Sequence, residues 1–572
     1  MLLSSGMRRL LLAAVAAVLV APTTAGAGEP IMALGDVQTG ARCTGLTVVH
    51  GTDVSSFDVD VLDVIDRQRP DAARILIRVS GATVAATGLG PGFSGSPIYC
   101  PDADGLSRTI GAVSTGIGEY GGAVALATPI ETILAEPVQP PSSAARSLAR
   151  SPVIGERSLA GPLTLSGVSP SLAEMFARAA RKAGRPLLTT GASPRATDYP
   201  PQPLVPGAAI AVGMTSGDIA IGAIGTVTYV DGANVWLFGH SLDGAGRRSL
   251  FLQDAYIHTV VNNPVGTADL STYKLGSPGN DVGTVTSDGL NAVAGLLGAL
   301  PPSYPVKVFA RDLDTGRVRS VTTRIADEAD VGRPTGPSIL GVAGSAAVAE
   351  AASSVLGGAP ARQSADMCFA ITLRELKRPV RFCEHYAVDG SGPNALAGAL
   401  SADVSQAAAL IDGYAFGVLH PTAVDVGLRV RRGLRQAYLL DASGPSRARR
   451  GRKVKLRLHL RRTVTGERFT RTISLLIPRD TSGGSHTIKL HGTDADVGSN
   501  PDEGGDLSLV FTDGPSPDES PPESAEQVRT AIEALERYDG VTATIGGDDL
   551  EAYRDPRLRI SGDARVVVTI RR

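Results

Sequence analysis

The sequence predicts a mainly β, multidomain protein with few short helices and a β-sandwich in its C-terminal half. A chain of 572 residues is long enough for several domains. It contains 67 glycines but only 4% aromatic residues, which favours short strands joined by tight turns over long helices. Most apolar runs are short, rich in β-branched side chains and bounded by turn residues, as strands are.

The N-terminus has the pattern of a secretory signal peptide. Arg8 and Arg9 precede the apolar run LLLAAVAAVLVA, and small residues at Ala25 and Ala27 form an A-x-A cleavage site. The alternative is a buried helix; the run is too short for the ~20 residues that span a bilayer. We interpret residues 1–27 as the signal peptide of an exported protein, extracellular or associated with the cell envelope. We expect no integral membrane segment after its removal.

Four cysteines are informative in an exported chain, because oxidising compartments favour disulfides. They form two sequence-local pairs, and we expect the disulfides Cys43–Cys100 and Cys368–Cys383. A zinc site is the rival interpretation, but the chain has no C-x-x-C and no histidine at ligand spacing. We therefore expect no metal and no cofactor.

The overall charge gives no reason to expect a polyanionic partner. The formal net charge is −2, and 43% of the residues are hydrophobic. Strongly basic chains are the ones that favour nucleic acids or anionic membranes. We expect no nucleic acid partner, and the sequence leaves the oligomeric state open.

The chain is divided by changes in pattern. In order, we expect the signal peptide (1–27), an N-terminal β region (28–137), a connector with one helix (138–205), a second β region (206–300), a mixed α/β region (301–419), a β-sandwich (420–513), a linker (514–525), and a C-terminal helix with strands (526–572).

Capping patterns locate the helices. Thr128, Pro129 and Glu131 form a capping-box pattern for a short helix at the end of the first β region. The connector helix is capped by Ser169 and extends to Gly184. The last helix begins at Ser524, with Gln527 completing a capping box.

The predicted sandwich has a basic outer face. In VKLRLHLRR the residues Lys455, Arg457, His459 and Arg461 alternate with apolar ones and share one side of a strand. One interpretation is a surface that binds an acidic polymer or a wall component. The other is a solvated β face without a ligand.

The segment GLGPGFSGSPIYC, from Gly88 to Cys100, places two serines on a glycine-rich turn. Such serines often bond only to the local backbone. A nucleophilic serine needs an exposed hydroxyl, a base and backbone N–H groups that face the developing oxyanion. The pattern is similar to G-D-S-G-G-P of trypsin-like enzymes, in which the positions of Gly92 and Ser94 supply those N–H groups. Ser94 is thus the candidate nucleophile, whereas Ser96, before a proline, is held extended and predicted to be structural.

His240 is the candidate base among the eight histidines. In WLFGHSLDGAG it follows an apolar strand and precedes a glycine-rich turn, a rigid place from which to present a ring. The alternative is a half-buried, hydrogen-bonded structural histidine. The preceding VDGAN predicts the turn of a hairpin.

Two motifs with matching flanks carry a resemblance to a known family. TGLGPGFSGSPIY…IGAV…ATPIETIL resembles the Gly-x-Ser-Gly-Ser-Pro segment of the SpoIVB-type sporulation serine peptidases, and IGTVTYVDGANVWLFGH resembles their histidine segment. The similarity covers roughly residues 30–300. It implies trypsin-like β-barrel regions in the N-terminal half and a serine endopeptidase that cleaves exported proteins. It also implies that Ser94 is the nucleophile and His240 the general base.

This chain departs from the family in two ways. Ser94 precedes His240, the reverse of the family order, although triads occur in several chain orders. The family has an acid shortly before the serine, where this sequence has Ser80; Asp243 and Asp254 are other candidates. The predicted function is an exported serine endopeptidase acting on protein or peptide substrates through a Ser-His mechanism. The alternative is a weak or inactive secreted or wall-associated β-rich binding protein on a peptidase-like scaffold.

Overall fold

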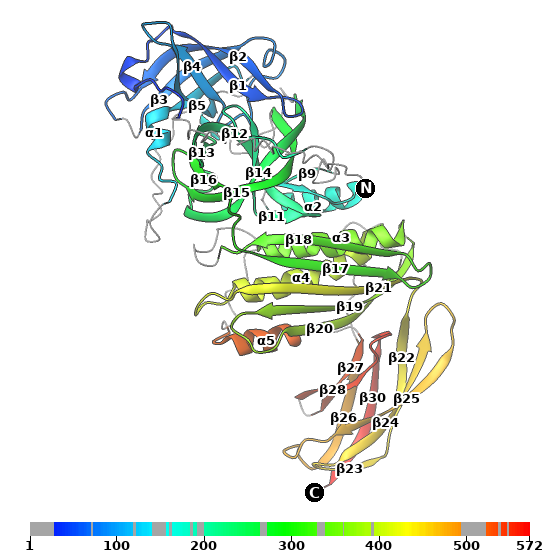
Figure 1. Cartoon of the computed structure of the whole chain (residues 1–572). Coiled ribbons are helices and arrows are strands. Elements are labelled where there is room, and N and C mark those ends of the chain that lie inside the picture. The colour runs from blue at the N-terminus through cyan, green and yellow to red at the C-terminus, as the bar shows by residue number, and fades with distance from the viewer. Residues whose placement is uncertain are drawn as a thin grey trace, which may run out of the picture.

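The computed structural model describes residues 28–69, 72–117, 122–139, 156–158, 163–183, 187–190, 200–262, 272–328, 338–358, 360–389, 394–492, 522–535, 539–545 and 548–571. The predicted signal peptide and residues 514–521 of the predicted linker lie outside these ranges. Figure 1 shows two barrels at one end, a helix-covered sheet in the middle and a sandwich at the C-terminal end. The mainly β, multidomain class is confirmed.

The first barrel closes in the order β1-β2-β3-β6-β5-β4, and β4 pairs with β1. Its strands are β1 (Arg42–Val48), β2 (Val54–Ile65), β3 (Arg74–Ser80), β4 (Pro97–Pro101), β5 (Ser107–Ile117) and β6 (Val124–Pro129). The short strand β7 (Glu156–Ser158) pairs with β5, and η1 (Leu34–Asp36) precedes the barrel. Alternate side chains such as Phe57, Val59 and Val61 fill the interior.

The disulfide Cys43–Cys100 is confirmed, with a Cα separation of 4.4 Å. It joins β1 to β4, the strand that leaves the serine turn. A second predicted disulfide, Cys368–Cys383, is also confirmed, with a Cα separation of 4.1 Å. Both bonds are consistent with an oxidising environment.

The helix after the first barrel, α1 (Ile130–Leu134), differs from the expected capping box. Pro129 occupies the N-cap, without a capping side chain. Thr128 Oγ1 instead donates to the carbonyl of Gly239, and Glu131 accepts from the N–H of Leu34. The two polar side chains therefore fasten distant segments rather than the helix end.

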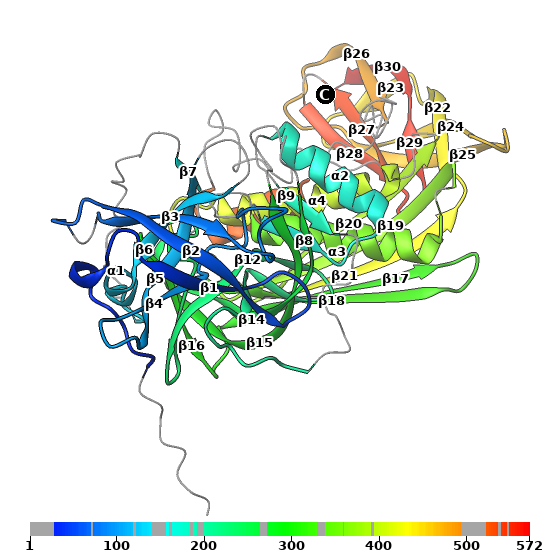
Figure 2. The same cartoon turned by 90° about the horizontal axis from the view of Figure 1, so that it is seen from above.

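The second barrel closes in the order β10-β14-β15-β16-β13-β12, and β12 pairs back with β10. Its strands are β10 (Ala209–Gly213), β12 (Ala220–Asp231), β13 (Asn234–Leu237), β14 (Gly246–Val261), β15 (Tyr273–Asp288) and β16 (Val293–Leu297). The predicted hairpin at VDGAN joins β12 to β13. The two barrels lie side by side in both views (Figures 1 and 2).

The predicted connector contributes strands as well as its helix. β8 (Leu163–Ser166) and β9 (Leu187–Thr190) extend the second sheet beyond β12. Between them lies α2 (Pro170–Lys182), which begins with a proline as expected, although the Ser169 side chain makes no capping bond. The apolar face of α2 is buried at Leu172, Met175 and Phe176.

The middle layer is a mixed sheet in the order β11-β18-β17-β21-β19-β20, with helices on one face (Figure 1). Its elements are β11 (Thr215–Gly217), β17 (Ser303–Asp312), β18 (Val318–Ala326), β19 (Arg362–Leu373), β20 (Val380–Asp389), β21 (Pro421–Arg432), α3 (Ile339–Leu356) and α4 (Ala395–Asp412). Among the described helices, α3 passes a length and hydropathy test for a membrane span, but 78% of it is buried in the protein. It is the central helix of this layer.

The sandwich boundaries differ from the prediction of 420–513. Its two sheets are β25-β24-β22-β29 and β23-β30-β26-β27-β28. The strands are β22 (Gln436–Ser443), β23 (Arg447–Arg449), β24 (Lys453–Arg462), β25 (Arg468–Leu476), β26 (Gly484–His491), β27 (Gly540–Ile545), β28 (Asp548–Arg554), β29 (Arg559–Ser561) and β30 (Asp563–Arg571).

Two corrections follow from this pairing. β21, expected at the start of the sandwich, instead lies between β17 and β19 in the middle sheet. The C-terminal strands, expected to form a separate unit, complete the sandwich. The helix between them, α5 (Ala525–Glu533), contacts α4 and β20, so the chain returns to the middle layer before it finishes the sandwich. Its capping at Ser524 is confirmed, since that side chain accepts from the N–H of Gln527.

The basic strand face has the expected alternation. Lys455, Arg457 and Arg461 are exposed on β24, and His459 is partly buried. The intervening apolar residues fill the sandwich core.

Candidate functional site

The serine turn, Gly90 to Ser96, lies in the connection between β3 and β4, and two of its glycines are in the left-handed region. Gly92 has φ +94° and Gly95 has φ +90°. L-residues with a Cβ rarely adopt these angles, which explains the glycines on either side of Ser94. The turn belongs to the first barrel by sequence, but it packs against the second.

Close backbone contacts fix the turn between the barrels. A Cβ added at Gly90 would lie 1.7 Å from the Thr272 carbonyl oxygen. One added at Gly95 would lie 2.1 Å from the Thr226 carbonyl oxygen and 2.6 Å from the Phe238 nitrogen. The glycines therefore serve this contact as well as the turn geometry.

Every carbonyl of the turn from Gly90 to Ser96 accepts a hydrogen bond. The donors belong partly to the turn itself and partly to β5, β12 and β15; the bonds are Phe93 N to Gly90 O, Lys274 N to Pro91 O, Thr226 Oγ1 to Gly92 O, Ser96 N and Oγ to Phe93 O, Thr226 N to Ser94 O, Thr228 Oγ1 to Gly95 O, and Val113 N to Ser96 O. A turn held at each peptide has a defined orientation.

The N–H groups of the turn divide into two sets. Those of Phe93, Gly95 and Ser96 donate to carbonyls at 2.8–3.0 Å. Those of Gly92 and Ser94, the two predicted for the oxyanion hole, have no acceptor among the described residues. The alternation leaves available the two donors that a developing oxyanion would need.

The histidine segment emerges from β13 through a sharp bend. Phe238 and Gly239 have φ +67° and +66°, and a positive φ at a bulky residue such as phenylalanine is an outlier that packing must hold in place. The Phe238 ring packs directly against Gly225, since a Cβ added at Gly225 would lie 1.8 Å from a ring carbon. The same ring stacks on His240, with 5.7 Å between ring centroids. His240 Nδ1 lies 2.6 Å from the Ser241 carbonyl oxygen.

The two segments meet at the same place on the first barrel. The Gly95 N–H donates to the Val113 carbonyl, and a Cβ added at Gly239 would lie 3.1 Å from that same oxygen. Ser94 and His240 are only 1% and 2% exposed. His240 Nδ1 is directed at the Ser241 carbonyl oxygen and not at the Ser94 hydroxyl. The segments are adjacent, in an arrangement closed to a polypeptide.

The candidate acids Asp243 and Asp254 also hold other parts of the chain. Asp243 forms an ion pair with the buried Arg248, which also pairs with Glu328. Asp254 accepts from the N–H groups of Gln202 and Asn280.

Ser80, in the place of the family acid, is exposed at the end of β3. The loop after His240 is held by Asp288, which accepts from the N–H groups of Leu242 and Asp243. Burial and the neighbouring Asp243 raise the pKa of the Asp288 carboxyl. Asp288 therefore supports the loop that carries His240.

Lys274, which sequence reasoning missed, lies beneath the serine turn. Its Nζ donates to Thr47 Oγ1 at 2.7 Å and to Thr226 Oγ1 at 3.1 Å, and lies 4.6 Å from the centre of the Phe93 ring. Burial lowers the pKa of its ammonium group to about 7. A single lysine in a strand carries no sequence signal of this kind, because its surroundings come from three distant segments.

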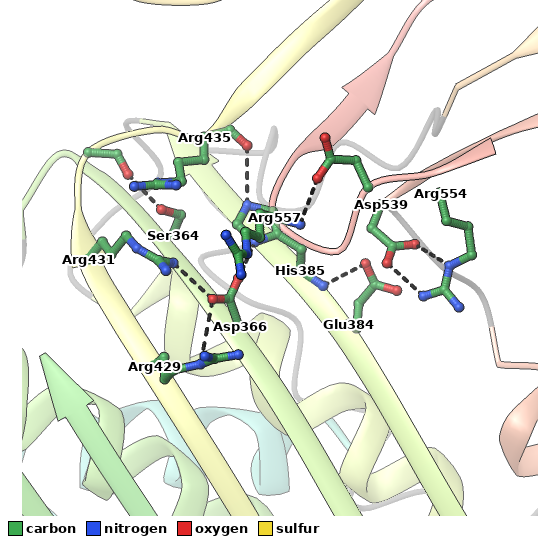
Figure 3. Close-up of polar contacts among 12 residues, drawn as sticks. Ser364, Asp366, Glu384, His385, Arg429, Arg431, Arg435, Asp539, Arg554 and Arg557 are labelled. Atoms are coloured by element: carbon green, nitrogen blue, oxygen red, sulfur yellow. Dashed lines mark hydrogen bonds and ion pairs between the residues drawn. The ribbon is translucent and has the colours of Figure 1, made fainter. Parts of the chain in front are cut away.

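A second polar cluster lies between the middle sheet and the sandwich (Figure 3). His385 Nδ1 lies 2.7 Å from Asp366 Oδ1, and its Nε2 lies 3.2 Å from the Arg435 carbonyl. Asp366 also pairs with Arg431 at 3.0 Å. Both ring nitrogens of this buried histidine are engaged, so His385 links β19 and β20 to the segment that leads into the sandwich.

No group of three or more His, Cys, Asp and Glu side chains suited to a metal ion occurs in the described ranges. Comparison with known proteins finds no family model, no curated protein and no solved structure that matches this chain.

Proposed function

We propose that this protein is an exported serine endopeptidase of the SpoIVB type, with Ser94 as the nucleophile and His240 as the general base. One observation carries the proposal. Between two closed barrels, the serine turn lies against the histidine segment, with the Gly92 and Ser94 N–H groups lacking acceptors among the described residues. The disulfides support export, and the predicted signal peptide supplies the route.

The chemistry follows from these groups. Ser94 Oγ attacks the carbonyl carbon of the scissile peptide while its proton passes to His240. The Gly92 and Ser94 N–H groups stabilise the oxyanion. The C–N bond then breaks as His240 returns the proton to the leaving amine. In the second step His240 takes a proton from the water that attacks the acyl-enzyme, and it returns this proton to Ser94 Oγ as the acid product leaves.

The tautomer of His240 suits this role. A carbonyl oxygen only accepts, so the contact with Ser241 requires the proton on Nδ1, which leaves the Nε2 lone pair as the base.

A second candidate function is supported by the burial of both residues. With Ser94 1% exposed and His240 2% exposed, a substrate reaches them only after the surrounding segments separate. If they do not separate, the barrels are a scaffold and the protein is a secreted or wall-associated binding protein.

A fluorophosphonate probe distinguishes the two functions. We expect labelling of the exported protein, its loss in Ser94→Ala and a comparable loss in His240→Ala, because the two residues act as a unit. Ser96→Ala is the comparison variant: the nucleophile is intact and the Ser96 N–H still holds the Phe93 carbonyl, so labelling should persist, at a reduced rate because the Ser96 hydroxyl that donates to the same carbonyl is lost. Labelling that persists in Ser94→Ala would contradict the peptidase.

A further inference from the structure

We propose that Lys274 is the positioning residue of the oxyanion hole, fixing the peptides whose N–H groups belong to Gly92 and Ser94. This inference rests on the proposed peptidase function. It assigns a role to a residue that contacts neither the nucleophile nor the base. In a trans peptide the C=O and the N–H point in opposite directions, so a residue that holds the C=O also orients the N–H.

The main chain of Lys274 orients the first donor. Its N–H donates to the Pro91 carbonyl at 2.9 Å. The Pro91 carbonyl and the Gly92 N–H belong to one peptide, and the described residues contain no cis peptide bond. Holding that carbonyl on β15 therefore turns the Gly92 N–H away from β15.

The side chain of Lys274 orients the second donor through a hydrogen-bonded chain. Nζ donates to Thr47 Oγ1, which lies 3.1 Å from Ser96 Oγ. Ser96 Oγ in turn donates to the Phe93 carbonyl at 2.7 Å. Because Ser96 has one hydroxyl proton, Thr47 is the donor in its bond with Ser96. The Phe93 carbonyl shares its peptide with the Ser94 N–H, so the chain ends at the second donor.

A second hydrogen-bonded chain from Lys274 holds the Gly92–Phe93 peptide, which lies between the two donor peptides. Nζ also donates to Thr226 Oγ1, which donates to the Gly92 carbonyl at 3.0 Å. The Lys274 side chain thus reaches two successive carbonyls of the turn, that of Gly92 through the Thr226 hydroxyl and that of Phe93 through the Thr47 and Ser96 hydroxyls. These hydroxyls come from different barrels, β1 and β12.

The surroundings of Nζ agree with a polar positioning role. Lys274 is 3% exposed, and burial alone, with no contribution from a neighbouring carboxylate, accounts for the lowered pKa of its ammonium group. Burying an amine without a counter-ion is unfavourable. A hydrophobic residue would fill the site at less cost but would leave both threonine hydroxyls without their donor.

The test measures the second-order rate of fluorophosphonate labelling in the full exported chain. Lys274→Met keeps the volume and removes the donor. We expect at least a tenfold slower rate, since losing one oxyanion donor costs ~10²–10³. Thr226→Val and Thr47→Val remove one hydrogen-bonded chain each, and we expect each to slow labelling.

Matched conservative variants separate positioning from folding. Thr226→Ser and Thr47→Ser retain the hydroxyls, so we expect labelling within about threefold of the unmodified protein. The melting temperature of each variant shows that it is folded. If Lys274→Met does not fold, the comparison of each valine variant with the serine variant at the same position still tests the positioning role.

The possible failures are distinguishable. If Ser94→Ala abolishes labelling but Lys274→Met and both valine variants label at the unmodified rate, the positioning role is wrong and the peptidase stands. Equal slowing in the serine and valine variants also overturns it, since packing would then be the cause. If the unmodified protein does not label at all, the peptidase function and this inference both fail.

Discussion

Gly95 has no space for a side chain, because the second barrel lies directly against it. An added Cβ would meet the Thr226 carbonyl oxygen at 2.1 Å, and φ is +90°. We expect Gly95→Ala to lower the free energy of unfolding by more than about 2 kcal/mol, combining backbone strain with this clash.

Gly105→Ala is the control, because it introduces backbone strain at a positive φ without a steric clash. Gly105 has φ +77° but nothing within 4 Å of an added Cβ. Its substitution should cost only ~1 kcal/mol in denaturant unfolding. Equal effects at Gly95 and Gly105 would contradict the packing of the turn between the barrels.

The lowered pKa of Lys274 predicts the direction in which the free energy of unfolding changes with pH. Its pKa is 10.5 when unperturbed and about 7 in the folded protein. Between these values the unfolded chain binds more protons, so stability rises with pH. Below the folded pKa both states are protonated and the penalty of burial is fully present.

We therefore expect Lys274→Met to raise the melting temperature most at about pH 6, with the difference from the unmodified protein shrinking towards about pH 10. Thermal unfolding across this range measures it. A difference that does not change with pH would mean that Lys274 titrates normally in the folded chain.

At the residue scale, the sequence showed the serine and histidine motifs but not the residues that hold the serine turn in place. The glycines and the serine of GFSGS predicted a tight turn, and the turn is present. Lys274, Thr47 and Thr226 could not be predicted, because each lies in a different strand. Their roles arise only when the two barrels pack together.

At the element scale, the disulfides test how β4 supports the serine turn. Cys43–Cys100 closes 57 residues and Cys368–Cys383 closes 15. From loop entropy, we expect the double alanine variants to lose about 4 and about 3 kcal/mol of stability, respectively. Only removal of Cys43–Cys100 should also slow probe labelling, because that bond holds the strand after Ser94. Slower labelling in both variants would contradict a local effect.

Element types were predicted better than element ends. The alternation of β24 and the apolar face of α2 were visible in the sequence, since each depends on one segment alone. The capping box at Thr128 was wrong, because Thr128 is still part of β6, Pro129 is the N-cap, and the Thr128 hydroxyl is directed at the Gly239 carbonyl. Tertiary contacts outweighed the local pattern there.

At the scale of the whole molecule, the sandwich boundaries make a prediction. A fragment of residues 420–513 lacks β27–β30, and β26 would lose both of its neighbours. We expect it to show no cooperative unfolding, whereas residues 434–571 should unfold cooperatively, because the buried core of the sandwich lies between Ala437 and Ile570. Cooperative unfolding of the shorter fragment would contradict the pairing of its strands.

The sequence predicted the fold class and the β-rich ends but not this return of the chain. β21 alternates as a sandwich strand would, and its apolar residues are buried in the middle layer instead. Periodicity reports which side of a strand is buried and not what buries it. The partner of a strand is set by the whole fold.

We propose that Ser94 is an activated nucleophile between the two barrels. Its most direct measurement is peptide mapping by mass spectrometry after reaction with a fluorophosphonate. We expect one phosphonylated peptide, modified at Ser94, in the unmodified protein and none in His240→Ala. No adduct at a probe concentration that labels a known serine hydrolase, or an adduct at a different serine, would contradict the claim.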